Sequence, residues 1–189
     1  MACGRAGFES VTGLGDPERV ATLAVTARLL PILGIQPMLG RAFTEQDDVP
    51  GAADRVLLSY GYWQRKFGGD RGVLGRKIDA GGVLREVTGV LPRNFWFFDQ
   101  SPDLIFPLQL DRSKATIGGF YFHAIARLKP GFTLTQANAD VGRMISLEQN
   151  KFPVFPGMSI KMFDDARFAP TCGSSNKMPS AISAKLSGC

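Results

Sequence analysis

The chain holds one histidine, His123, and three cysteines, so it has few of the side chains that carry nucleophilic or metal chemistry. The cysteines, Cys3, Cys172 and Cys189, lie near the two ends and show no C-x-x-C spacing. A structural zinc site draws four cysteine or histidine ligands, usually from closely spaced pairs. We therefore expect no metal-binding residue, and we interpret His123 as a structural residue within a strand.

Two pairs of adjacent carboxylates and one glycine-rich segment are the remaining candidates for catalysis or phosphate binding. Asp47-Asp48 and Asp164-Asp165 are neighbours in sequence, and the side chains of adjacent residues diverge in an extended chain. The glycine-rich segment 68–77 matches neither of the phosphate-binding glycine motifs and leads into a predicted strand. The sequence therefore predicts no catalytic and no cofactor-binding residue, and a protein that is not an enzyme.

Four consecutive aromatic residues, Phe95, Trp96, Phe97 and Phe98, form the most distinctive run of the sequence. Contiguous aromatic side chains at a surface mark contact sites, here for a protein partner or for lipid headgroups. In the alternative interpretation, the rings fold back over a sheet and serve only the core. Both interpretations stay open, and the four residues are the candidate contact loop.

The composition is that of a folded globular domain, with 189 residues of which 44% are hydrophobic and 21% charged. The net charge of +5 comes from dispersed lysines and arginines, without the basic stripe that would indicate nucleic-acid binding. The sequence has no apolar run near the roughly 18–20 residues that a spanning helix needs. Its first residues also lack the apolar core of a secretory signal. We expect no transmembrane helix, no signal peptide and no nucleic-acid partner.

Turn and capping signals organise the first 110 residues into short elements. An alternating apolar run at 20–26 predicts a strand, and Thr44-Glu45-Gln46-Asp47 is a capping box that opens one helical turn. Residues of about 55–110 are expected to form a mainly β part. Its predicted elements are a strand at 56–58, a helix from Ser59 to Phe67, a hairpin of 75–80 and 83–91 joined by Gly81-Gly82, and a strand at 103–108. Tyr60, Trp63 and Phe67 share one helical stripe, which predicts core packing.

Residues of about 119–163 have the pattern of a β-α-β unit. A strand at 120–128 is followed by the capping box Thr133-Leu134-Thr135-Gln136, a helix, and a second strand at Met158–Phe163. Because the connection is a helix-length crossover, the two strands should be parallel neighbours or have one strand between them. The serine-rich segment 170–189 shows no periodic apolar pattern, so we expect a disordered tail there.

Five ordered blocks of the sequence resemble the MacB-like periplasmic core domains of ABC transporter permeases. The segment Val25–Thr44 is similar to the pattern V-[ST]-x-x-[FL]-[FL]-x-[VI]-L-G-[VI]-x-P-x-L-G-R-x-F-[ST] of that family. Residues 127–137 are similar to its block R-L-K-P-G-x-T-x-x-Q-A. The other blocks are 56–70, 74–78 and 87–92. Together they cover about residues 11–165, and the wording is closest to the large-permease branch whose substrates are undefined.

The resemblance implies an α+β fold made of a porter-like β-α-β unit and a second, mainly β subdomain with a hairpin. It also implies a place on the periplasmic face of the bacterial cytoplasmic membrane. The implied function is non-catalytic coupling to transport through domain movement and protein–protein contacts. The implied partners are the remainder of a permease or a second copy in a dimer, a periplasmic adaptor in some members, and an ATPase subunit only indirectly. The family has no catalytic residues in this domain.

Two alternatives to a permease domain remain at this point. The chain could be a free-standing soluble protein-binding module of the same fold, with Phe95–Phe98 as its contact patch. It could also be a basic nucleic-acid-binding domain, an alternative that only the net charge of +5 supports. Family members carry a transmembrane helix before this domain and three after it. Because this sequence has none, the resemblance predicts a fragment truncated of its membrane helices.

Overall fold

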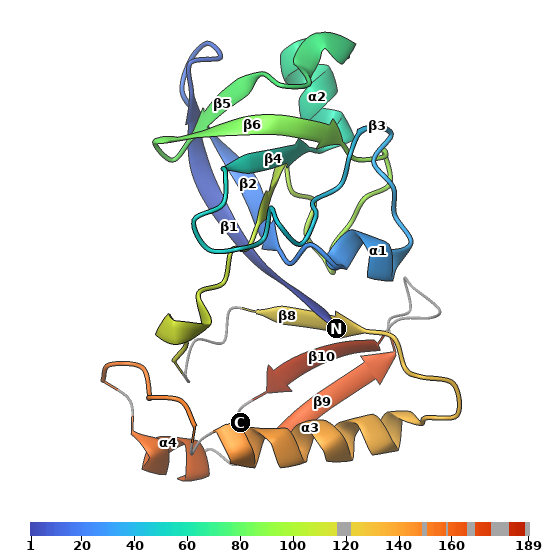
Figure 1. Ribbon diagram of the computed structural model, residues 1–189, viewed down its shortest axis with the longest axis vertical. Helices are drawn as coiled ribbons and strands as arrows, with labels where there is room; N and C mark the ends of the chain where they lie inside the picture. Colours follow the sequence, from blue (N-terminus) through green and yellow to red (C-terminus); the bar gives the residue numbers. More distant parts are fainter. Residues whose placement is uncertain (117–121, 149–150, 158, 166–168, 175–181, 188–189) are drawn as a thin grey trace. The chain divides into compact units, whose positions relative to one another are not determined.

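A computed structural model describes residues 1–116, 122–148, 151–157, 159–165, 169–174 and 182–187 (Figure 1). The chain divides into two units, Ala2–Leu110 and Asp111–Cys189, with Met1 grouped with the second. Both units combine strands and helices, which confirms the predicted α+β class. Within the described residues, no helix is long and apolar enough to cross a membrane.

Six strands of the first unit form a closed ring of hydrogen-bonded pairs. Going round the ring, the order is β1-β2-β7-β4-β6-β5 and back to β1. The pairs β2–β7 and β4–β6 are parallel and the other four are antiparallel. The strands are β1 (Ala2–Thr12), β2 (Glu18–Val25), β4 (Arg55–Leu58), β5 (Lys77–Ala80), β6 (Val83–Val90) and β7 (Leu104–Pro107). The short β3 (Leu39–Gly40) pairs with the end of β6.

This unit therefore begins at Ala2 and not at about residue 55, where the sequence placed the start of the mainly β part. The long β1–β2 ribbon, in register from Gly4 opposite Val25 to Val11 opposite Glu18, supplies two of the six strands. Each strand of the ring contributes to one hydrophobic core. The core residues are Val11, Val20, Val56, Leu58, Ile78, Ala80, Val87, Val90, Leu104 and Phe106 from the strands, with Tyr62, Trp63 and Val73 from the connections.

The predicted helix after β4 is confirmed as α2 (Tyr60–Phe67). Ser59 caps it by accepting a hydrogen bond from the Tyr62 backbone N–H at 3.2 Å. Trp63 lies in the core, and Tyr60 and Phe67 pack against that core while partly exposed. The aromatic stripe is thus core packing, as predicted. Two shorter helical turns, α1 (Leu29–Leu33) and η1 (Arg71–Val73), also belong to this unit.

The predicted hairpin is confirmed by the antiparallel pairing of β5 with β6, in which Ala80 lies opposite Val83. Gly81 and Gly82 form its tip with φ of 65° and 77°. Positive φ at both central residues is typical of a type I′ turn, which suits the twist of a two-residue hairpin and favours glycine.

The second unit consists of a small sheet and helices, and the long helix α3 follows the first strand of that sheet along the chain. It contains η2 (Arg112–Lys114), β8 (His123–Ala126), α3 (Leu134–Glu148), α4 (Ile160–Asp165), β9 (Ala169–Ser174) and β10 (Ile182–Ser187). The strand β10 pairs antiparallel with both β8 and β9. Strands β8 and β9 are therefore parallel to each other, with β10 between them. Thr133 and Gln136 form the predicted capping box of α3, with bonds of 2.8 and 3.2 Å.

The prediction of a strand at Met158–Phe163 is wrong. A short helix, α4, occupies Ile160–Asp165, and the strand that follows the crossover is β9. The reason is local: Ser159 accepts a hydrogen bond from the backbone N–H of Met162 at 3.4 Å, as the N-cap of a helix does. Met158 itself lies outside the described residues.

The segment 170–189 also differs from its expectation. Where the sequence suggested a disordered tail, the structure has most of β9 and all of β10, in register from Ala169 opposite Ser187 to Ser174 opposite Ile182. The sheet pairing of β10 with β8 and β9 supplies the order that composition alone does not indicate. Residues 175–181 and 188–189 lie outside the described part.

Candidate functional site

The structure separates the four aromatic residues of the candidate contact loop. Phe95 and Phe97 are buried, with exposed fractions of 5% and 1%, whereas Trp96 between them is 52% exposed. Phe97 and Gln100 exchange two backbone hydrogen bonds of 3.1 and 3.0 Å, so Phe98 and Asp99 form the tip of a tight turn. The Phe98 ring meets Phe97 edge to face at 4.8 Å. Two rings thus serve the core, and Trp96 is the one that is presented to solvent.

The Phe97 ring is seated against the backbone of β1. A Cβ atom added to Gly4 would lie 2.9 Å from Cε1 of Phe97, closer than carbon atoms approach in folded proteins. Glycine at this position therefore leaves the space that the ring occupies. The aromatic loop and the first strand, about 90 residues apart in sequence, depend on each other for packing.

The start of the same loop is fastened to α2. The guanidinium of Arg93 lies 4.3 Å from the centre of the Tyr60 ring and donates a hydrogen bond to the Tyr60 hydroxyl. Tyr60 in turn meets Trp63 edge to face at 5.8 Å. A cation over an aromatic face is attracted by the electrons of the ring. Trp96 is therefore held between two anchored ends, which lowers the entropy that it would lose on binding.

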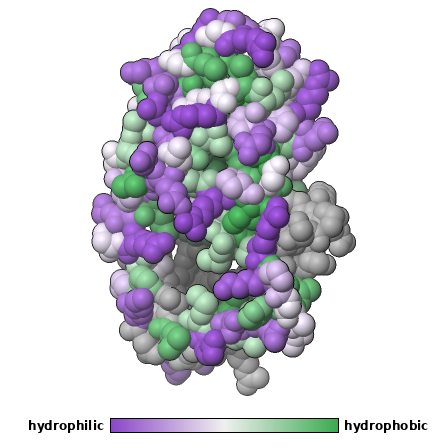
Figure 2. Space-filling model, turned by 45° about the vertical axis from the view of Figure 1, so that its right-hand side comes forward, coloured by the Kyte–Doolittle hydropathy of each residue, from purple (hydrophilic) through white to green (hydrophobic). Residues whose placement is uncertain are grey.

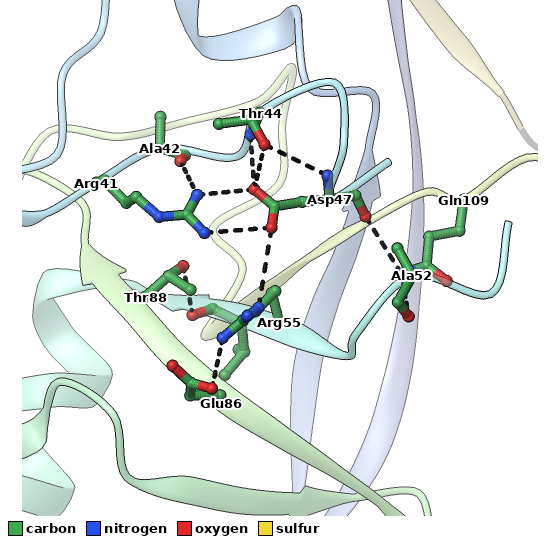
Figure 3. Close-up of polar contacts among 10 residues, drawn as sticks. Arg41, Ala42, Thr44, Asp47, Ala52, Arg55, Glu86, Thr88 and Gln109 are labelled. Atoms are coloured by element: carbon green, nitrogen blue, oxygen red, sulfur yellow. Dashed lines mark hydrogen bonds and ion pairs between the residues drawn. The ribbon is translucent and has the colours of Figure 1, made fainter. Parts of the chain in front are cut away.

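A second cluster of polar side chains surrounds the buried carboxylate of Asp47 (Figure 3). Asp47 lies just after the segment Val25–Thr44, which carries part of the family resemblance. Asp47 accepts hydrogen bonds from Arg41 Nη1 at 2.7 Å and Nη2 at 3.2 Å. Thr44 donates to it through its backbone N–H and its hydroxyl, both at 2.8 Å. These bonds, that of Arg41 first, hold the pKa of Asp47 well below its usual range, although burial opposes them.

Arg55 joins this cluster to the strands of the ring. Its Nε lies 3.8 Å from Asp47 Oδ1, and its Nη1 forms an ion pair with Glu86 of β6 (Figure 3). Asp47 is thus ionised near neutral pH, and its carboxylate is held by hydrogen bonds from Arg41 and Thr44. The cluster holds the loop of residues 41–47 against β4 and β6, and it is unsuited to acid–base chemistry.

Asp48 points to different partners, as expected for adjacent side chains. It accepts hydrogen bonds from the backbone N–H groups of Ala27 at 2.9 Å and Gln109 at 2.8 Å. The side-chain amide of Gln109 donates to the carbonyl oxygens of Asp47 at 3.2 Å and Ala52 at 3.3 Å. We call Asp47, Asp48 and Gln109 the exit clamp, because Gln109 lies at the end of the first unit. Only the Thr44–Asp47 half of this network had a local sequence signal.

The described residues offer no site for a metal ion, since no three histidine, cysteine or acidic side chains among them converge. Burial, with a smaller effect of the Asp48 charge, raises the pKa of the Cys3 thiol and keeps it protonated. His123 is half-buried in β8. On the face drawn in Figure 2, charged and polar residues are interspersed with small apolar areas.

Comparison with known proteins identifies a family model and several solved structures that are similar to this chain. The family model of the MacB-like periplasmic core domain matches residues 4–144. The periplasmic region of MacB from Actinobacillus actinomycetemcomitans is 17% identical with a TM-score of 0.59, over 79% of this chain and 67% of that one. A domain of a putative permease protein from Porphyromonas gingivalis is 20% identical with a TM-score of 0.59, over 78% and 69%.

A third solved structure is the extracellular domain of the noncanonic ABC-type transporter YknZ from Gram-positive bacteria. It is 19% identical with a TM-score of 0.47, over 57% of this chain and 53% of that one. The chain thus spans about half of the YknZ domain and about two thirds of the other two. No curated protein gives a significant match. Because the family model covers well over half of the sequence, this chain belongs to the family of MacB-like periplasmic core domains of ABC transporter permeases.

Proposed function

We propose that the chain serves as the extracytoplasmic domain of an ABC-type permease, on the periplasmic face of the bacterial cytoplasmic membrane, and acts without catalysing a reaction. The family match over residues 4–144 carries this proposal. The core domain would span about residues 11–165. Its coupling to transport would work through protein contacts and movement of its two units, which the division of the chain after Leu110 supports.

The proposed partners are the remainder of a permease and a second copy of the chain. A periplasmic adaptor is a further partner, and an ATPase subunit would act only through the membrane part. Trp96 is the residue that we assign to contact, with Phe95, Phe97 and Phe98 as the structure that presents it. Tryptophan residues with a fixed conformation are over-represented among the side chains that dominate binding energy at interfaces.

Site-specific photo-cross-linking in the native host tests this function. A photoreactive phenylalanine analogue at position 96 should cross-link to a membrane segment of a permease, to a second copy or to a periplasmic adaptor, identified by mass spectrometry. Leu84 in β6 is the matched control position, because it is 60% exposed but lies on the glycine hairpin. Equal cross-linking from both positions, or none from position 96, would contradict the assignment of Trp96.

The free-standing binding module is the second candidate, and the anchored, exposed Trp96 favours it equally. The same experiment separates the two functions. Cross-links from position 96 to a protein that is neither a permease, nor a second copy, nor an adaptor would replace the permease function by this one.

A further inference from the structure

The long strand β1 has an outer edge that β5 covers only at one end. β2 pairs with β1 along most of its length, whereas β5 reaches only Val11 and Thr12 (Figure 1). The four consecutive residues Arg5–Phe8 are all exposed, Phe8 to 61%. Because successive side chains of a strand point to opposite faces, β1 is open on both faces here. β8 is a further neighbour of β1 in the sheet order, but these four residues remain exposed in the whole chain.

Two hydrogen bonds show which backbone groups of β1 point to this outer edge. In an antiparallel pair, both backbone groups of one residue point to the same side, and successive residues alternate. The Cys3 carbonyl accepts a bond from the N–H of Thr26, directly after β2, at 2.9 Å. The Ser10 carbonyl accepts one from Gly81, at the tip of the β5–β6 hairpin, at 2.9 Å. The register with β2 is unbroken between them, so odd-numbered residues face β2 and even-numbered residues face the outer edge.

The exposed stretch is complementary in sequence to a second copy of itself. Its residues are Arg5-Ala6-Gly7-Phe8-Glu9, with a cation at one end and an anion at the other. When two such strands lie antiparallel with Gly7 opposite Gly7, Arg5 of each copy lies opposite Glu9 of the other, and Ala6 lies opposite Phe8. Among the described residues, neither Arg5 nor Glu9 forms a salt bridge. A register centred on Ala6 or on Phe8 would leave both charges without an opposite charge.

We propose that the outer edge of β1 is a dimer contact, in which this stretch pairs antiparallel with the same stretch of a second copy and Gly7 lies at the two-fold axis. An open strand edge is a template for pairing with another chain. In this register even-numbered residues lie opposite one another, so each pair of Ala6 and Phe8 exchanges both of its N–H···O bonds. The two Gly7 residues form the close pair without hydrogen bonds, where no side chain obstructs the approach.

The charges at the two ends of the stretch favour this partner and this register. Opposite charges that face each other across two strands stabilise the pair, and like charges destabilise it. The contact is short, and two copies anchored in one membrane would meet at a high effective concentration. That consequence rests on the proposed function, whereas the dimer itself can be measured in the isolated chain.

Cysteine cross-linking of the full chain, in a cysteine-free background, tests the register. Gly7→Cys should form a disulfide-linked dimer on mild oxidation, because the two Cα atoms would lie about 4.5 Å apart. The new Cβ would lie 3.3 Å from the Thr22 hydroxyl oxygen, a contact that a small shift relieves. Arg5→Cys alone should not cross-link, since its two copies would be four residues apart along the strands, about 13 Å. Arg5→Cys mixed with Glu9→Cys should cross-link.

Charge exchange, followed by sedimentation equilibrium, tests the pairing without a new cysteine. Arg5→Glu and Glu9→Arg should each weaken the dimer at least about tenfold, because like charges then face each other at both ends. The double variant exchanges the two charges and should bind within about threefold of the parent. Amide exchange at Ala6 and Phe8 should slow as the protein concentration rises, because their N–H groups become bonded only in the dimer.

Several results would overturn the proposal. They are a chain that stays monomeric at millimolar concentration, a dimer that Gly7→Cys does not cross-link, and a double variant as weak as the single ones. Amides of Ala6 and Phe8 that are protected even in dilute protein would show that the same chain already covers the edge. In the native host, a product of Gly7→Cys with the mass of a different protein would replace the second copy by that partner. None of these results bears on cross-linking from position 96, so the two proposals fail separately.

Discussion

At the scale of single residues, replacing glycine by alanine should have opposite effects on stability at Gly4 and at Gly61, because only Gly4 lies against another side chain. Gly4→Ala places a methyl group 2.9 Å from the ring, and we expect it to lower the free energy of unfolding by about 1–3 kcal/mol. Gly61→Ala lies inside α2 with no atom within 4 Å of the new methyl, and should raise it by about 0.5–1 kcal/mol. Urea unfolding measures both. A Gly4→Ala variant as stable as the parent would show that the ring moves aside freely.

The ionised state of Asp47 should appear in the pH dependence of stability. Its pKa is lower in the folded chain than the value of about 3.9 in an unfolded one. Its contribution is therefore complete above about pH 5 and is lost as the pH falls below about 4. Asp47→Asn should cost about 2 kcal/mol near pH 7, because charged hydrogen bonds are removed, and should flatten the acid side of the profile.

Unfolding free energies between pH 7 and 3 check this, with Asp16→Asn as the control. Asp16 is exposed and has no ion pair among the described residues. A parent protein that loses stability in acid no faster than Asp47→Asn would contradict the role given to the carboxylate.

At the scale of elements, the sequence predicted those features of the structure that depend only on residues close together in the chain. The Ser59 cap, the Gly81-Gly82 turn and the Thr133–Gln136 box are each complete within a few residues, and each is found as predicted. The closed ring was not predictable in this way, because β2 pairs with β7 some 80 residues away. The exit clamp was missed for the same reason, since the partners of Asp48 lie 21 and 61 residues from it.

The sequence of β10 contains the apolar alternation of a strand, but it lies within a serine- and glycine-rich segment whose composition suggested disorder. Ile182, Ala184 and Leu186 alternate with Ser183, Lys185 and Ser187, which is the period of a strand. The surrounding serines and glycines gave the segment the composition of a tail. A six-residue alternation is short, and it gains its meaning from the two strands that pair with it.

A proline in β10 tests whether this strand is part of the sheet. Ala184 lies opposite Ala124 of β8 and Cys172 of β9, so Ala184→Pro removes a backbone donor from the middle of three strands. We expect amide exchange in β8 and β9 to become at least about tenfold faster, with no change in the first unit. Ser183→Ala keeps its N–H and should change little. Unaltered protection in Ala184→Pro would return the segment to the disordered tail that its composition suggested.

At the scale of the whole molecule, the net charge and the tryptophans are unequally divided between the two units. Residues 1–110 hold twelve basic and twelve acidic side chains, so the whole net charge of +5 belongs to residues 111–189. Both tryptophans, Trp63 and Trp96, lie in the first unit. Tryptophan fluorescence therefore reports on the first unit alone, and ion-exchange behaviour is dominated by the second.

A chain of residues 1–110 should fold by itself, because its six strands close on one another and share one hydrophobic core. We expect cooperative urea unfolding, elution near neutrality in ion exchange, and the tryptophan emission of the full chain. Trp63 is 6% exposed and Trp96 52% exposed, so iodide should quench one emitting population and spare the other in both chains. A matched chain of residues 14–110, which lacks β1 and breaks the ring between β2 and β5, should fail to unfold cooperatively. If instead residues 1–110 emit with both tryptophans open to iodide, the ring depends on residues 111–189 for its stability.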